Sequence, residues 1–146
     1  ILQKLCDELD YEYFIFSAYD NSDSLIYHTN VMMCVAEEFV VACLDSIKDI
    51  EERQSFIELV ENCDKELIEI SMEQMENFAG NMLEVKGENG KRFLVMSESA
   101  YKSLTKKQIA QLEAHVEIIH SSLDTIEACG GGSARCMMAE IFLPKE

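Results

Sequence analysis

The sequence predicts an α+β protein assembled from repeated strand–strand–helix–strand units. Three observations support this prediction: hairpins of two short strand-like runs occur twice, helical segments follow each hairpin, and a further short strand follows each helical segment. Such units expose an apolar face, so they stack around an axis, and about three or more make a stable assembly. The chain carries about two to two and a half of them.

The first unit follows a short amphipathic helix predicted over residues 1–9. Two nearly continuous apolar runs, residues 31–36 and 39–44, are separated by two glutamates and form the predicted hairpin. Because these strands are apolar on both faces, we expect both faces of the sheet to be covered. Residues 46–63 then show helical spacing of apolar side chains, and residues 66–70 form a short strand.

The second unit is marked by capping and turn residues. Ser71 opens a helix that is expected to end near Gly80, and Thr105 caps another helix with Gln108 three residues on. A turn rich in glycine and asparagine predicts a second hairpin. The remaining predicted elements are hairpin arms at residues 82–86 and 92–96, helices at 99–104 and 105–116, and strands at 117–120, 125–128 and 137–142.

Length and composition exclude several classes of protein. With 146 residues and 48% hydrophobic residues, the chain has the size of one domain that can bury a core. The formal net charge of −16 argues against nucleic acid as a partner, because that affinity depends on lysine and arginine displacing counterions. No stretch approaches the roughly 20 apolar residues of a membrane span, so no membrane partner is expected.

The six cysteines lack the paired spacing of a disulfide framework or a zinc site, and we expect no metal. Cys6, Cys34, Cys43 and Cys63 lie in apolar or helical settings, so reduced, buried thiols are expected. This cysteine usage predicts a cytoplasmic protein.

The most unusual segment is CGGGSARCM, residues 129–137, which holds half of the six glycines in one run. Glycines such as Gly131 and Gly132 let backbone amides approach a ligand or a developing negative charge. Cys136 follows beside Arg135, and amide dipoles with a fixed positive charge favour the thiolate that a nucleophile needs. The alternative interpretation is a flexible turn followed by a buried strand cysteine.

A second unusual segment is IYHTNVMMC, residues 26–34, where one polar cluster interrupts an apolar stretch. His28 lies in this cluster, and histidine is the side chain best suited to proton transfer near neutrality, although a lone histidine is more often structural. His115 and His120 are expected to be structural. Asn81, at a helix end, is expected to cap or to adopt a left-handed backbone, with a substrate-facing amide as the alternative.

These motifs resemble a known superfamily. Residues 26–44, IYHTNVMMCVAEEFVVACL, and residues 129–144, CGGGSARCMMAEIFLP, together resemble the histidine and cysteine signatures of the arginine deiminase and amidinotransferase superfamily. Residues 77–85, NFAGNMLEV, resemble its helix-to-strand junction, so the resemblance spans most of the chain. The wording of both signatures is closest to bacterial amidinotransferase-like proteins described as citrulline-utilisation hydrolases.

The resemblance implies a pentein fold, a five-bladed propeller of ββαβ modules around a central active site. Residues 1–146 would be the C-terminal catalytic portion of that single domain, an expectation that the absence of an initiator Met supports. The resemblance also implies that Cys136 attacks the planar carbon of a guanidino or ureido compound, such as arginine or citrulline, and forms a covalent intermediate. His28 would protonate the departing nitrogen and then activate water. No cofactor is implied.

Other roles are implied or left open. Asn81, Arg135, Gly131 and Gly132 are candidate substrate-binding residues. No motif is found for the carboxylates with which such enzymes bind substrate nitrogens, so these are expected in preceding modules. An amidinotransferase, in which an amine replaces water, and an inactive binding or structural member of the fold are the alternatives. The expected partner is the small-molecule substrate, and a homo-oligomer is left open.

Overall fold

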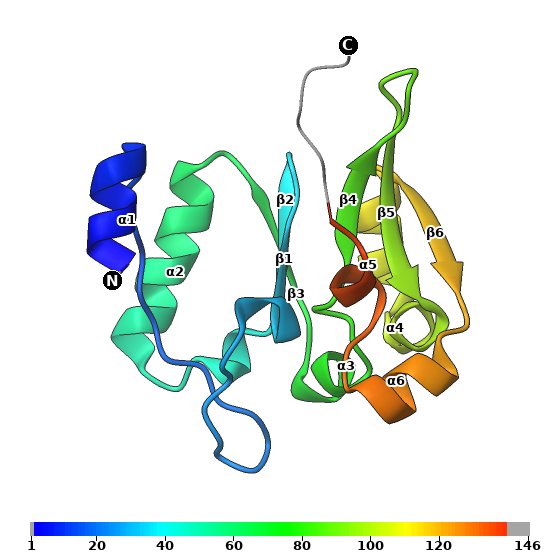
Figure 1. Cartoon of the computed structure of the whole chain (residues 1–146), viewed down its shortest axis with the longest axis horizontal. Coiled ribbons are helices and arrows are strands. Elements are labelled where there is room, and N and C mark those ends of the chain that lie inside the picture. Colours follow the sequence, from blue (N-terminus) through cyan, green and yellow to red (C-terminus); the bar gives the residue numbers. More distant parts are fainter. Residues whose placement is uncertain (1, 140–146) are drawn as a thin grey trace.

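The computed structural model describes residues 2–139 of the chain. It contains two three-stranded sheets of identical topology, β1-β2-β3 and β4-β5-β6. In each sheet the first two strands form an antiparallel hairpin, and the third strand pairs in parallel with the second. Figure 1 shows the two modules side by side, and β1 contacts β4 at their boundary. The predicted repeat of strand, strand, helix and strand is confirmed.

The first module is built around a fully buried central strand, β2. Its residue Val41 pairs with Cys34 on one side and with Ile68 on the other. Helix α2 begins at Ile50 rather than at Ser46, because the Asp49 side chain caps it by accepting hydrogen bonds from two backbone N–H groups of the first turn. The elements are α1 (Leu2–Leu9), the 3-10 helix η1 (Thr29–Val31), β1 (Met33–Val35), β2 (Phe39–Ala42), η2 (Leu44–Ser46), α2 (Ile50–Asn62) and β3 (Glu66–Glu69).

The second module starts with a short helix and repeats the same order of strands. Its hairpin turn contains Gly90 in the left-handed region, at φ 79°, as the turn composition predicts. The elements are α3 (Met72–Glu76), β4 (Leu83–Lys86), β5 (Arg92–Ser97), α4 (Glu98–Ser103), α5 (Lys106–Glu113), β6 (Glu117–Ser121), α6 (Asp124–Gly130) and η3 (Ala134–Met137). None of the helices within residues 2–139 is long and apolar enough to cross a membrane.

Two capping boxes join helices α3 and α5. Ser71 and Gln74 form the box at the start of α3, and Thr105 and Gln108 form the box at the start of α5. The two glutamines also bond to each other: Gln74 Nε2 lies 2.8 Å from Gln108 Oε1, and Gln108 Nε2 lies 3.0 Å from Gln74 Oε1. The helix starts predicted from the sequence are thus confirmed, and the structure adds the bond between them.

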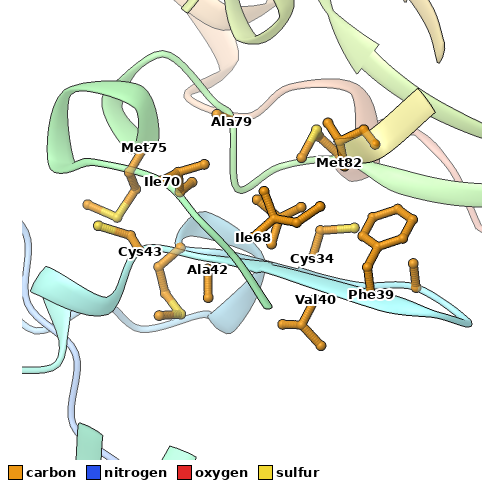
Figure 2. Close-up of a cluster of buried hydrophobic side chains, with 14 of the residues drawn as sticks. Cys34, Phe39, Val40, Ala42, Cys43, Ile68, Ile70, Met75, Ala79 and Met82 are labelled. Carbon is orange, nitrogen blue, oxygen red and sulfur yellow. The ribbon is translucent and has the colours of Figure 1, made fainter. Parts of the chain in front are cut away.

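The core continues from one module into the other. The sheet of the first module has α2 on one side and the second module on the other (Figure 1). Figure 2 shows Cys34, Phe39 and Ile68 pointing towards Met82, whereas Val40 points to the opposite face of the sheet. All five side chains are at most 3% exposed. The expectation that both faces of this sheet are covered is therefore confirmed.

Charged side chains bridge the two modules at the start of β3. The imidazole of His115, which follows α5, has Nε2 2.8 Å from a Glu66 carboxylate oxygen and Nδ1 3.0 Å from a Glu38 carboxylate oxygen. Arg92 on β5 also pairs with Glu38. The hydrogen bonds to Glu66 and Glu38 raise the pKa of His115, while those from Arg92 and His115 lower the pKa of Glu38 and the bond from His115 lowers that of Glu66.

Two predicted strands near the C-terminal end are wrong within the described residues. Residues 125–128 lie in α6, where the acidic residues Asp124 and Glu127 favour a helix start and Ile126 is 41% exposed. A segment of four residues is too short for its pattern of apolar side chains to distinguish a strand from a helix. Met137, expected to begin a strand, ends the 3-10 helix η3, and residues 140–142 of that prediction lie outside the described part of the chain.

The cysteine expectations are confirmed at three positions and wrong at one. Cys6, Cys34 and Cys43 are buried, and burial raises the pKa of the Cys43 thiol. Cys63 is exposed, because it follows the last turn of α2 and only its backbone N–H is held, by the carbonyls of that turn. Cys6, Cys43, Cys63, Cys129 and Cys136 form no disulfide within residues 2–139.

Candidate active site

A pocket of about 430 Å³ opens where three separate segments of the chain meet. They are the start of η1, the junction between α3 and β4, and the glycine loop that leads from α6 into η3. These are the three segments that the sequence analysis singled out. The lining residues are Tyr27, His28, Asn30, Val31, Met75, Glu76, Phe78, Asn81, Gly131, Gly132 and Cys136.

Cys136 lies in η3 with its side chain exposed to this pocket, so it is not the buried strand cysteine of the alternative interpretation. The glycine loop leaves room for it: a Cβ at position 132 would lie 3.0 Å from both Cβ and Sγ of Cys136. The loop is anchored on both sides. Ser133 donates a hydrogen bond of 2.6 Å to Glu127, and η3 contacts β5.

His28 is the residue that precedes η1, and it lines the same pocket as Cys136. Its Nδ1 accepts a hydrogen bond of 3.3 Å from the backbone N–H of Asn30. A ring nitrogen that accepts a hydrogen bond carries no proton, so the neutral imidazole bears its proton on Nε2. His28 and Cys136, although far apart in sequence, therefore border the same pocket.

The other two histidines lie elsewhere, as expected. His115 is part of the charged cluster between the modules, and His120 stacks on Tyr101 with ring centroids 4.0 Å apart. Neither borders the pocket that holds Cys136.

Asn81 connects all three segments of the pocket. Its side chain is nearly buried, at 4% exposure, and its Nδ2 donates to the backbone oxygen of Asn30 at 3.0 Å and to Cys136 Sγ at 3.3 Å. Its Oδ1 accepts from the backbone N–H of Arg135 at 3.2 Å. The left-handed residue of this junction is Phe78, at φ 64°, and not Asn81. A bulky residue held at positive φ in a pocket wall is the kind of strain that clusters at functional sites.

Gly80 has a different role from the helix stop predicted for it, since α3 already ends at Glu76. A Cβ at position 80 would lie 2.5 Å from the backbone oxygen of Val31 and 2.8 Å from the carbonyl carbon of Met32. The missing side chain therefore allows the junction that carries Asn81 to lie directly on the segment that carries His28 and Asn30.

Arg135 is placed beside the pocket and does not line it. Its guanidinium Nη1 lies 3.4 Å from the backbone oxygen of Met33, and its backbone N–H binds Asn81. Gly131, in the left-handed region at φ 65°, and Gly132 both line the pocket.

The structure adds pocket residues that sequence reasoning missed. Glu76 contributes a carboxylate to the wall, and Asn21 holds it through a hydrogen bond of 2.5 Å. Among 28 acidic residues nothing in the sequence distinguishes this one. Tyr27, next to His28, is 91% exposed at the pocket rim. Its position beside the histidine motif is the signal that could have pointed to it.

The pocket combines three kinds of chemical group. The thiol of Cys136 is a potential nucleophile, the imidazole of His28 can transfer protons, and the carboxylate of Glu76 can bind a cationic group. Within the described residues, no cluster of three histidine, cysteine or acidic side chains is placed to bind a metal ion.

Comparison with known proteins identifies the class. The structure resembles the apo crystal structure of ArgZ, an arginine dihydrolase from the ornithine-ammonia cycle in cyanobacteria, with a TM-score of 0.68 and 17% sequence identity over 92% of this chain and 19% of that chain. The fold is therefore the pentein fold, and together with the sequence profile of the family it shows the arginine deiminase and amidinotransferase superfamily expected from the sequence.

The family follows from the sequence profile. The profile of the eukaryotic N,N-dimethylarginine dimethylhydrolases matches residues 1–143, and the chain belongs to this family. The signature wording had pointed to citrulline-utilisation hydrolases within the same superfamily. No curated protein matches the chain significantly. The chain spans about a fifth of the ArgZ chain, 19% of its length.

Proposed function

We propose that the full protein is a cysteine hydrolase that cleaves a C–N bond of an arginine-like guanidino compound or of a related ureido compound. The observation that supports this function best is that Cys136 and His28 line one pocket together with Glu76 and Asn81. The family is named for hydrolysis of a methylated arginine, and the structural neighbour is named an arginine dihydrolase.

In the proposed first step, the Cys136 thiolate attacks the planar carbon of the substrate and forms a C–S bond. At this stage His28 is protonated on both ring nitrogens and no longer accepts a hydrogen bond from Asn30. It gives its Nε2 proton to the departing nitrogen as the C–N bond breaks, and an amine or ammonia leaves. The enzyme then holds a covalent amidino or carbamoyl group on sulfur, and the imidazole is neutral.

The second step releases the product. The neutral imidazole of His28 takes a proton from water as the oxygen attacks the same carbon, and the C–S bond breaks to restore the thiolate and the imidazolium. One water is consumed, and no external oxidant, reductant or cofactor is needed. If an amine took the place of water, the same residues would catalyse amidino transfer.

Substrate binding is assigned to the remaining groups of the pocket. The carboxylate of Glu76 offsets the charge of a guanidinium, whose desolvation would otherwise oppose binding. The backbone around Gly131 and Gly132 approaches the reacting centre. Arg135 supports the loop in this proposal, and further carboxylates come from modules beyond the described residues. Because a free thiolate is required, the proposal places the protein in a reducing compartment such as the cytoplasm.

The test compares the full protein with three variants on arginine, N,N-dimethylarginine and citrulline. We expect Cys136→Ser to abolish release of amine and ammonia, and His28→Ala to reduce turnover by roughly 10²–10⁴-fold with little change in binding. Cys129→Ser is the matched control, because Cys129 is also an exposed thiol of this region but does not line the pocket. Mass spectrometry of the unmodified protein, quenched by acid during turnover, should find the substrate-derived group on Cys136.

Three outcomes decide the matter. Turnover that survives Cys136→Ser, or an adduct on Cys129, would overturn the assignment. Product formation that requires an added amine would identify an amidinotransferase.

A further inference from the structure

Two carboxamide side chains from different modules point at the sulfur of Cys136. Asn81 Nδ2 lies 3.3 Å from Sγ, and Asn30 Nδ2 lies 3.8 Å from it. These amides provide every N–H donor that reaches this sulfur within residues 2–139, and none comes from His28. The protein therefore surrounds its candidate nucleophile with neutral donors.

We propose that Asn81 and Asn30 form an amide pair that orients Cys136 Sγ and stabilises the negative charge that the sulfur carries when it attacks, without a bond to His28. The proposal rests on the proposed function for the identity of the nucleophile, and it gives Asn81 a role in activation rather than in substrate binding.

The orientation of the Asn81 amide is fixed by its other two partners. Its oxygen accepts the backbone N–H of Arg135, which as a donor can bond only to the oxygen end of the amide. Its nitrogen donates one hydrogen to the backbone oxygen of Asn30, which as an acceptor can bond only to the nitrogen end. The second amide hydrogen then points to Cys136 Sγ.

A sulfur that faces amide hydrogens is stabilised as an acceptor. A thiol could instead donate to Asn81 Oδ1, but that distance is 3.6 Å, longer than the 3.3 Å from Nδ2. Hydrogen bonds to an ionised group are stronger than those to a neutral one, so donation favours the thiolate. Because Asn81 is nearly buried, water competes poorly for its amide hydrogens.

Asn30 links the nucleophile to the acid/base residue. Its backbone N–H bonds to His28 Nδ1, while its side-chain amide reaches Cys136 Sγ. One residue thereby sets the His28 tautomer and contributes to thiolate stabilisation, and it fixes the spacing between the two groups.

The charged groups around Cys136 have partners of their own. The guanidinium of Arg135 bonds to the backbone oxygen of Met33, and Glu76 accepts from Asn21. Glu127 accepts from the hydroxyls of Ser99 and Ser133.

His28 and Tyr27 are the remaining titratable side chains of the pocket. Tyr27 is 91% exposed at the rim, and His28 Nδ1 is occupied by Asn30. Within the described residues, the amide pair is therefore the structural source of thiolate stabilisation.

The test measures alkylation of Cys136 by iodoacetamide as a function of pH, with the modified residue quantified by mass spectrometry. It is carried out on the full protein and on the variants Asn81→Ala and Asn30→Ala. We expect the midpoint of the pH profile to move up by about one unit in Asn81→Ala, with alkylation near neutral pH falling by about tenfold. A smaller upward shift is expected for Asn30→Ala, because its donor is farther from the sulfur.

Asn77→Ala is the matched control. Asn77 is the residue that follows α3, four positions before Asn81, and its side chain bonds only to the backbone oxygen of Glu73 in the described structure. Its pH profile should coincide with that of the unmodified protein. Folded Asn81→Ala and Asn30→Ala proteins with an unshifted midpoint would overturn the amide pair. If Asn81→Ala does not fold, Asn30→Ala decides by the same criterion.

The outcome is independent of substrate. A shifted midpoint in a protein that turns over no guanidino or ureido compound would support the amide pair and refute the proposed function. Turnover that depends on Cys136, together with an unshifted midpoint, would support the proposed function and refute the amide pair.

Discussion

Gly80→Ala tests whether the pocket depends on close approach of two backbone segments. The new methyl group would lie 2.5 Å from the Val31 oxygen and 2.8 Å from the Met32 carbonyl carbon. Ordinary contact begins at 3.4 Å, so the segments must separate by up to 3.4 − 2.5 = 0.9 Å. Both obstacles are backbone atoms, and no flexible side chain can move aside. We expect the free energy of unfolding to fall by about 1–3 kcal/mol, as for other overpacked sites.

The same displacement acts on the site. The bond from Asn81 Nδ2 to the Asn30 oxygen, at 3.0 Å, crosses this boundary, and it would be stretched beyond hydrogen-bonding distance. Urea unfolding of the full protein measures the loss of stability, and iodoacetamide alkylation reports on Cys136. Gly130→Ala is the control, because nothing lies within 4 Å of a Cβ at that position. The reasoning is refuted if Gly80→Ala and Gly130→Ala have the same urea midpoint of unfolding.

Two further predictions concern charged groups. The cluster of His115 with Glu38 and Glu66 should stabilise the protein most between pH 4.5 and 6.5, the ordinary pKa values of its carboxyl and imidazole groups. The raised pKa of His115 gives stability that is complete below 6.5 and is lost as pH rises through the folded value, whereas the lowered carboxyl pKa values give stability that is lost as pH falls through theirs. The difference in unfolding midpoint between His115→Gln and the unmodified protein should therefore be largest between pH 4.5 and 6.5. An equal difference at pH 9 would contradict this prediction. Glu76→Gln should lower kcat/KM for a cationic guanidino substrate about three- to fivefold, the effect of a partly solvated ion pair, and leave a neutral ureido substrate nearly unchanged; equal losses on both would exclude a role in charge recognition.

Local chemistry allowed much of the fold to be predicted from the sequence. The capping residues Ser71 and Thr105 marked true helix starts, and the glycine turn before β5 marked a true hairpin. The strand predicted at residues 125–128 failed because a four-residue segment is too short to show a period, and the acidic residues Asp124 and Glu127 favour a helix start.

The site was predictable only where an unusual residue type drew attention. Cys136 and His28 stood out by their neighbours in the chain, and the structure brings them to one pocket. Glu76 did not stand out, since its place in the wall depends on how α3 packs. The role of Asn81 was likewise hidden, because its partners are distant in sequence and its importance comes from burial between them.

The reciprocal bond between Gln74 and Gln108 has a consequence for how the pocket moves. Because each glutamine caps its own helix and holds the other, the first turns of α3 and α5 cannot fray separately. Helix α3 carries Met75 and Glu76 of the pocket wall. We therefore expect that wall to exchange its amide hydrogens as slowly as the start of α5, and local opening to expose amides of both helices together.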